Sequence, residues 1–117
     1  MNRIAVLGAL AVLFGVAGCA SNPLPPAKVT DTQASISAAD AIGAGSNPRA
    51  ALHLKLAREQ LQQGESLLRN GDDEEARLVI DRARMDAELA LALTREEQAR
   101  RDARVSMDKA NNVGQQH

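Results

Sequence analysis

The sequence predicts an all-α protein, in which a short helix precedes a long antiparallel helical hairpin. Apolar and small residues recur every three or four positions through most of residues 36–107. Glycines interrupt this repeat at two points, and residues that favour a helix start follow each of them. The chain has 117 residues, which is room for one domain.

The chain begins with a segment typical of a secretory signal. Residues 1–3 are short and positively charged, residues 4–16 are apolar, and small residues follow. The apolar run is shorter than the ~20 residues that a membrane-spanning helix needs. We therefore expect residues 1–18 to be a signal peptide.

The end of this segment resembles the bacterial lipobox, whose four positions are here Val16, Ala17, Gly18 and Cys19. The resemblance implies cleavage between Gly18 and Cys19, a diacylglyceryl thioether on the Cys19 thiol, and a palmitate-type chain on the new amine. By similarity to enterobacterial sorting, Ala20 in place of Asp implies an outer-membrane lipoprotein that faces the periplasm. The alternative is an uncleaved anchor with an incidental cysteine.

Residues 19–29 are predicted to be the lipidated cysteine and a tether. Pro23, Pro25 and Pro26 favour an extended spacer of ~3.1 Å per residue. A disordered leader is the alternative, and it has the same consequence of separating the domain from the lipid.

The helical domain is predicted to span residues 30–111. Thr30 and Gln33 have the spacing of a capping box, so Thr30 is the expected N-cap of the first helix. Gly43 and Gly45 are expected to end this helix, because glycine adopts the left-handed C′ conformation at little cost.

The second helix is expected over residues 48–70. Asn47 is a favourable N-cap, and Pro48 suits the first helical position. The expected apolar stripe consists of Ala50, Leu54, Ala57, Leu61, Gly64 and Leu68. A turn at Gly71 would then bring the third helix back antiparallel.

The third helix is expected over residues 74–109, with Asp72 as its N-cap and residues 112–117 as a disordered tail. Its expected stripe consists of Ala76, Ile80, Ala83, Ala87, Ala90 and Thr94. Residues 95–104 are almost wholly charged, and residues beyond about 95 are therefore expected to project into solvent. Ala99, Ala103 and Met107 continue a thin stripe, for which a coiled-coil seam is the alternative interpretation.

No catalytic constellation is evident, so we expect no enzyme activity, cofactor or metal site. The sequence lacks the zinc-protease, P-loop and nucleophile-elbow motifs. His53 and His117 have no partner at ligand spacing, and Cys19 is the only cysteine. The acidic residues 72–75 are better explained as helix capping than as a calcium site, because the liganding loop is missing.

Nucleic-acid binding and small-molecule substrates are also not expected. The formal net charge is −1, and the only aromatic residue is Phe14, inside the signal. Arginines of residues 95–104 suggest a phosphate-binding face, but the acids interleaved with them favour a solvated surface.

Residues 37–48 and 57–92, with the pair Asp86-Ala87, resemble small bacterial envelope lipoproteins that carry domain of unknown function 4398. The resemblance implies an Ala-rich helix ending in a Gly-Ala step, followed by a helical hairpin. Relatives often add a peptidoglycan-binding domain, which is not carried over to this chain. A tetratricopeptide unit is a weaker match, because its bulky aromatic positions are missing and one hairpin is fewer than the ~3 repeats needed.

These observations predict a non-enzymatic envelope lipoprotein that contacts the membrane through its lipid. Its helices would act as a periplasmic spacer or as a docking module for envelope proteins. The alternative is a structural lipoprotein that self-assembles through its C-terminal helix.

Overall fold

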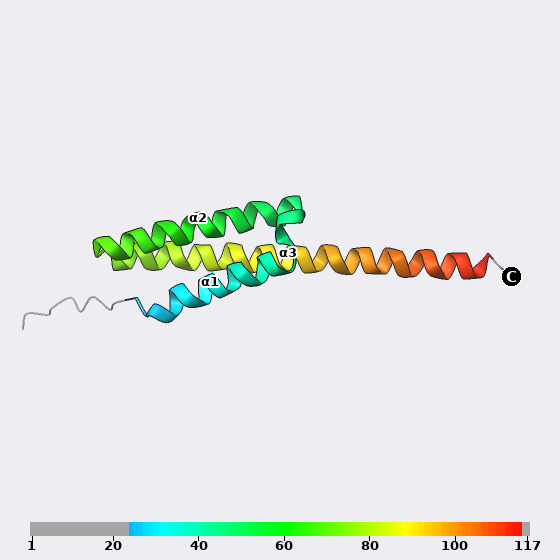
Figure 1. Ribbon diagram of the computed structural model, residues 1–117, viewed down its shortest axis with the longest axis horizontal. Helices are drawn as coiled ribbons and strands as arrows, with labels where there is room; N and C mark the ends of the chain where they lie inside the picture. Colours follow the sequence, from blue (N-terminus) through cyan, green and yellow to red (C-terminus); the bar gives the residue numbers. More distant parts are fainter. Residues whose placement is uncertain (1–23, 116–117) are drawn as a thin grey trace, which may run out of the picture.

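The computed structural model describes residues 24–115, which form the predicted all-α fold (Figure 1). The elements in order are α1 (Pro26–Ala41), the 3₁₀ helix η1 (Ala44–Ser46), α2 (Pro48–Asn70) and α3 (Asp73–Gly114). α2 and α3 form an antiparallel hairpin, and α1 lies along its side. Within these residues, no helix combines the length and the apolar character that crossing a membrane requires.

α1 begins five residues earlier than the capping box predicts, and Thr30 is therefore not its N-cap. Pro25 occupies the N-cap and Pro26 the first helical position. Proline favours that position because its fixed φ suits the helix and its missing N–H would have no partner there. Thr30 lies inside the helix, where its hydroxyl donates to the Pro26 carbonyl at 3.4 Å. The predicted tether consequently loses residues 26–29 to α1.

Two glycines with positive φ create the two breaks in the helical repeat. Gly43, with φ of 87°, follows α1, and Gly71, with φ of 86°, follows α2. At the second break the N–H of Gly71 donates to the Leu68 carbonyl and that of Asp72 donates to the Leu67 carbonyl. These two bonds satisfy carbonyls at the end of α2 and reverse the chain into α3.

The N-caps of α2 and α3 differ in how they work. The Asn47 side-chain oxygen accepts hydrogen bonds from the N–H groups of Arg49 and Ala50, at 3.0 and 3.3 Å. The Asn47 amide also donates to the Leu93 carbonyl at 3.3 Å, which ties the start of α2 to α3. Asp72 stands at the N-cap of α3, but its side chain makes no capping hydrogen bond.

Small side chains form most of the contact surface between α2 and α3, which we call the α2–α3 seam. The buried residues of α2 are Ala50, Leu54, Ala57, Leu61 and Gly64. Those of α3 are Ala76, Val79, Ile80, Ala83, Ala87, Ala90, Leu93 and Thr94. The predicted stripes therefore do face each other, although Leu68 is only partly buried. Because most of these side chains are small, the two helix axes can approach closely.

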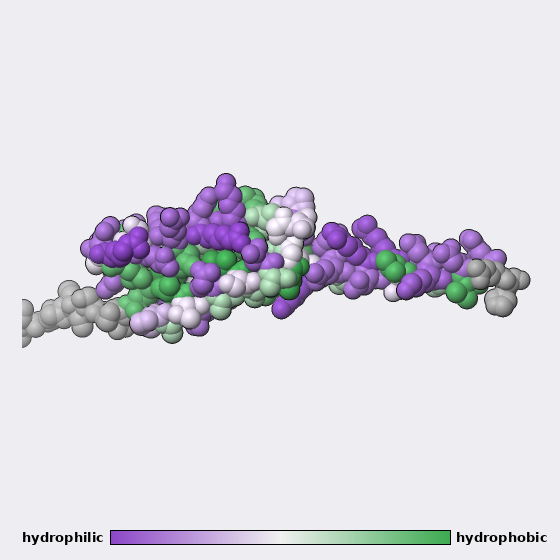
Figure 2. Space-filling view, in the orientation of Figure 1, coloured by the Kyte–Doolittle hydropathy of each residue, from purple (hydrophilic) through white to green (hydrophobic). Residues whose placement is uncertain are grey.

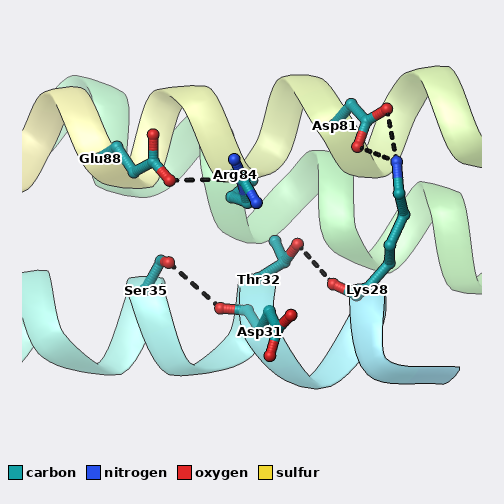
Figure 3. A network of polar contacts seen from close by, with 7 residues as sticks. All are labelled: Lys28, Asp31, Thr32, Ser35, Asp81, Arg84 and Glu88. Atoms are coloured by element: carbon teal, nitrogen blue, oxygen red, sulfur yellow. Dashed lines mark hydrogen bonds and ion pairs between the residues drawn. The ribbon is translucent and has the colours of Figure 1, made fainter. Parts of the chain in front are cut away.

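α1 completes the core and makes a polar edge along α3 (Figure 3). Its buried residues are Thr32, Ile36 and Ala39. Near the start of α1, Lys28 Nζ lies 2.6 and 2.8 Å from the two carboxylate oxygens of Asp81 on α3. This half-exposed ion pair contributes modest stability, and it joins the start of α1 to the first turns of α3.

α3 is much longer than the helices that cover it. It contains 42 residues and is about 63 Å long at 1.5 Å per residue. Thr94 is its last buried residue, and residues 98–115 are all exposed. The charged second half consequently extends beyond α1 and α2 as a lone helix (Figures 1 and 2). The helix continues to Gly114, so residues 112–114 are helical and not part of a disordered tail.

Candidate functional site

The predicted lipidation site lies outside the described residues. Its positions are Val16, Ala17, Gly18 and Cys19, and His117 also lies outside. The described chain begins at Leu24, whose side chain is buried in the core. It begins at the end of the molecule where α2 turns into α3, opposite the free end of α3 (Figure 1).

A polar network joins α2 to α3 within the apolar seam. One carboxylate oxygen of Asp86 lies 2.8 Å from Nδ1 of His53, and the other accepts a hydrogen bond from the Gln60 amide at 2.9 Å. The side chains of Asp86 and His53 are only 20% and 27% exposed. Ala87, next in sequence, is fully buried against the neighbouring helices. The Asp-Ala pair singled out in the sequence thus combines a polar link with a close apolar contact.

The hydrogen bonds around Asp86 give His53 a structural role. Its ring contacts a carboxylate that α3 presents to α2, and the same carboxylate is held on its other side by Gln60. Hydrogen bonds to a charged, partly buried carboxylate stabilise a fold by about 1.5–3 kcal/mol each. The contacts therefore make His53 a partly packed histidine that links α2 to α3.

The acidic residues 72–75 surround the start of α3 at the hairpin turn. Together with Gly71 and Leu78 they line an open depression. Their position at the helix N-terminus complements the helix dipole. In the part of the chain that the structure describes, no group of three or more His, Cys, Asp or Glu side chains is arranged to hold a metal ion.

Residues 95–104 carry ion pairs along their own helix. Arg100 contacts Glu96 at 2.5 Å, and Arg101 contacts Glu97 at 3.0 Å. The hydrogen bond from Arg101 is the main cause that lowers the pKa of the Glu97 carboxyl, and the nearby arginine charges lower it further. Since two of the arginines are already paired, the segment fits the solvated surface better than a phosphate-binding face.

An uncovered face with recurring apolar residues runs along almost the whole of α3, interrupted by the charged side chains of Arg82 and Glu96. We call it the open face, and it consists of Leu78, Met85, Leu89, Ala92, Ala99, Ala103, Met107 and Ala110. These residues recur at spacings of three, four and seven, so they share one side of the helix. All are exposed, and Leu78, Met85 and Met107 are 57%, 67% and 65% exposed.

The open face lies opposite the face of α3 that packs on α1 and α2. Sequence reasoning found only its C-terminal part, the stripe of Ala99, Ala103 and Met107. It missed that Leu78 and Met85 continue the same line toward the hairpin turn. The sequence does show this line as the seven-residue spacing of Leu78, Met85, Ala92 and Ala99. The alanine-rich stripe on the opposite side of the helix is the more regular pattern, and it was the one assigned to the core.

The fold and its surfaces define a helical-hairpin module with one long helix that has a free end and an uncovered apolar face. The chain belongs to the family named domain of unknown function (DUF4398), whose model matches residues 27–115. The match extends from the first turn of α1 to the end of α3, and it confirms the family predicted from residues 37–48 and 57–92. No curated protein and no solved structure matches the chain.

Proposed function

We propose that the chain is a non-enzymatic bacterial envelope lipoprotein, held at the outer membrane by lipid on Cys19. Its helices act there as a periplasmic spacer and docking module. The observation that carries this proposal is the polarity of the molecule: the described chain begins at one end, and the uncovered part of α3 extends from the other (Figure 1).

The ion pair between Lys28 and Asp81 supports this polarity, because it sets the start of α1 beside the first turns of α3. From Asp81 to Gly114, α3 extends for about 50 Å at 1.5 Å per residue. A lipid on Cys19 therefore holds the hairpin end near the membrane, and residues 95–114 reach away from it.

The lipobox resemblance supports the anchor. Each acyl CH₂ that enters the bilayer contributes ~0.8 kcal/mol, and two chains already give stable attachment. The tether before α1 then needs only a few residues to separate the domain from the lipid surface. Ala20 supports the outer membrane and the periplasmic orientation through the sorting rule described above.

The open face supports the docking role. Large apolar side chains such as Met85 and Met107 are exposed on it, while the ion pair of Arg101 and Glu97 lies on another face of α3. Large apolar side chains exposed on one side of a helix are typical of a contact site for another protein. The contacts of this module are thus side-on helix contacts, and no substrate pocket is involved.

The anchor is tested by growing bacteria that express the full chain with radiolabelled palmitate. We expect label on the wild-type chain and on Ala20→Ser, which keeps the cysteine, and none on Cys19→Ser. Intact-mass measurement of the native product supplies the second readout. An unmodified thiol with residues 1–18 still attached would contradict the proposal.

The docking role is tested with a photoreactive residue at Met107 on the open face and, as a matched control, at Asn112. Both positions are exposed on the projecting helix, but Asn112 points away from the open face. We expect discrete protein adducts at Met107 only. Equal adducts at both positions, or none at either, would exclude a docking face.

A further inference from the structure

We infer that the open face of α3 docks onto the same face of a second copy of this chain, with the two helices antiparallel. The inference rests on the docking role proposed above and names the partner. Self-assembly through the C-terminal helix is the alternative function predicted from the sequence. The surface inferred here is larger, because the open face extends from the projecting segment back along the hairpin.

The projecting half of α3 lacks the packing that normally stabilises a helix. Residues 98–115 are all exposed, so they contribute almost nothing to the core. Most of the stability of a helix in a protein comes from the packing of one of its faces, and this segment has no packed face. A second helix along the open face supplies that packing, and it also covers Met85 and Met107.

Side-chain size defines how two open faces fit. With Arg82, Glu96 and Ser106 included, the positions from Leu78 to Ala110 follow the alternating four-and-three spacing of a coiled-coil seam, and Met107 lies beside that seam. In one antiparallel register, Ala92 lies opposite Ala103 of the second copy, and Met85 lies opposite Ala110. The same register sets Leu89 opposite Ser106. Met85 and Leu89 therefore each meet a small side chain, Glu96 lies opposite Ala99, and the pair of Ala92 and Ala103 permits close approach between these layers.

The flanking charges are complementary in this register. Glu88 lies beside Lys109 of the second copy, and Arg95 lies beside Asp102. Two-fold symmetry repeats both pairs, which gives four contacts between opposite charges. Within residues 24–115 the side chains of Arg95, Asp102 and Lys109 have no hydrogen bond or ion pair, and Glu88 has only an exposed contact with Arg84 at 3.2 Å.

Like-charge contacts disfavour a parallel arrangement of the two α3 helices. A parallel pair in register sets Arg82 against Arg82 of the second copy and Glu96 against Glu96, both within the seam. It also brings Arg95 beside Arg100. Like charges that face each other weaken an association, whereas the antiparallel register sets Arg82 opposite Val113. The antiparallel register therefore avoids the like-charge contacts that the parallel arrangement makes.

The orientation has a consequence for the proposed anchor. In the antiparallel pair the two α1 starts lie at opposite ends of the assembly. Both lipids reach the same bilayer only when the pair lies along its surface, and otherwise the pair spans the gap between two facing lipid surfaces. Only the second arrangement keeps the role of a spacer that extends away from the membrane.

The test uses two differently tagged full-length chains, co-expressed in bacteria. One carries Ala92→Cys and the other Ala103→Cys, and membranes are treated with a mild oxidant. We expect a mixed disulfide between the two tags, because the inferred register sets these positions opposite each other. Each variant expressed alone should give no disulfide dimer above the wild-type background, whose only cysteine is Cys19.

Further variants test whether the disulfide depends on the inferred register. Asn112→Cys, on the other side of α3, should not couple to Ala92→Cys. Glu88→Lys should lower the yield of the mixed disulfide several-fold, and adding Lys109→Glu should restore it. Recovery by the second charge change is expected only if the two residues meet across the interface.

The other possible outcomes would contradict the antiparallel pairing or the lipid anchor. Same-variant dimers would overturn the antiparallel arrangement, and disulfides to a different protein, or none, would overturn self-docking. Palmitate label measured in the same samples separates this inference from the anchor. If the chains carry the palmitate label but form no mixed disulfide, the anchor is supported and the antiparallel pairing is refuted. If the mixed disulfide forms on chains without label, the pairing is supported and the anchor is contradicted.

Discussion

Gly64 lies in the middle of α2, where an alanine would normally stabilise the helix. Here it is buried, and it faces Ile80 of α3. A Cβ added at Gly64 would overlap the Cγ1 atom of Ile80, and it would stand 3.1 Å from Cδ1 and 3.5 Å from the Ala76 carbonyl oxygen. Ile80 cannot easily turn away, because it is fully buried and β-branched side chains have one strongly preferred rotamer in a helix.

Two opposing effects determine the result of Gly64→Ala. Helix propensity favours alanine over glycine by about 1 kcal/mol. Overpacking of a filled core costs about 1–3 kcal/mol. We therefore expect a net loss of about 1 kcal/mol in the free energy of unfolding. The measurement is urea unfolding followed by circular dichroism, on a chain that lacks its first nineteen residues.

Gly45→Ala is the matched control. Gly45 has no atom within 4 Å of an added Cβ, and its φ lies outside the left-handed region. Its replacement should be neutral or should stabilise by about 0.4–1 kcal/mol. In an Ile80→Ala background, where the space is open, Gly64→Ala should change sign and become stabilising. A stabilising effect of Gly64→Ala in the wild-type background would refute the close contact between α2 and α3.

Three further predictions concern single side chains. Asn47→Ala should lower the free energy of unfolding by about 1–2 kcal/mol in urea melts, and Asn47→Asp by less, because the aspartate keeps the capping oxygen. Asp86→Ala should destabilise by about 1–3 kcal/mol, since it leaves polar groups of α2 without their acceptor; thermal melts measure this. Arg101→Gln should raise the pKa of Glu97 in a carboxyl NMR titration. That arginine lowers the folded pKa, so its stabilising contact is present at neutral pH and is lost as pH falls through that pKa.

Local sequence signals predicted most of the fold. The second helix was expected over residues 48–70, and α2 has those bounds. Gly71 stands where the repeat breaks and adopts the positive φ that the turn requires. These features depend on neighbours in sequence, such as the alternation of small and polar residues, so no knowledge of distant contacts was needed.

The start of α1 shows where two local signals compete. Thr30 and Gln33 have the spacing of a capping box, but the prolines upstream offer an earlier start. The structure begins the helix at Pro26, and the Thr30 hydroxyl bonds back to a carbonyl of the same helix. Spacing alone does not rank such signals, because their balance depends on the packing of Leu24 and the first turn of α1 against the core.

The sequence by itself determined that residues 24–115 are largely helical, where two of the three α-helices in this range begin, and which residues share a side of each helix. Only the tertiary structure decided which sides meet. It joined Asp86 to His53, pressed Gly64 against Ile80, and left Met85 uncovered. The physical reason is that the helical period depends on residues three or four apart, whereas the choice of partner face depends on how well side chains far apart in sequence fit together.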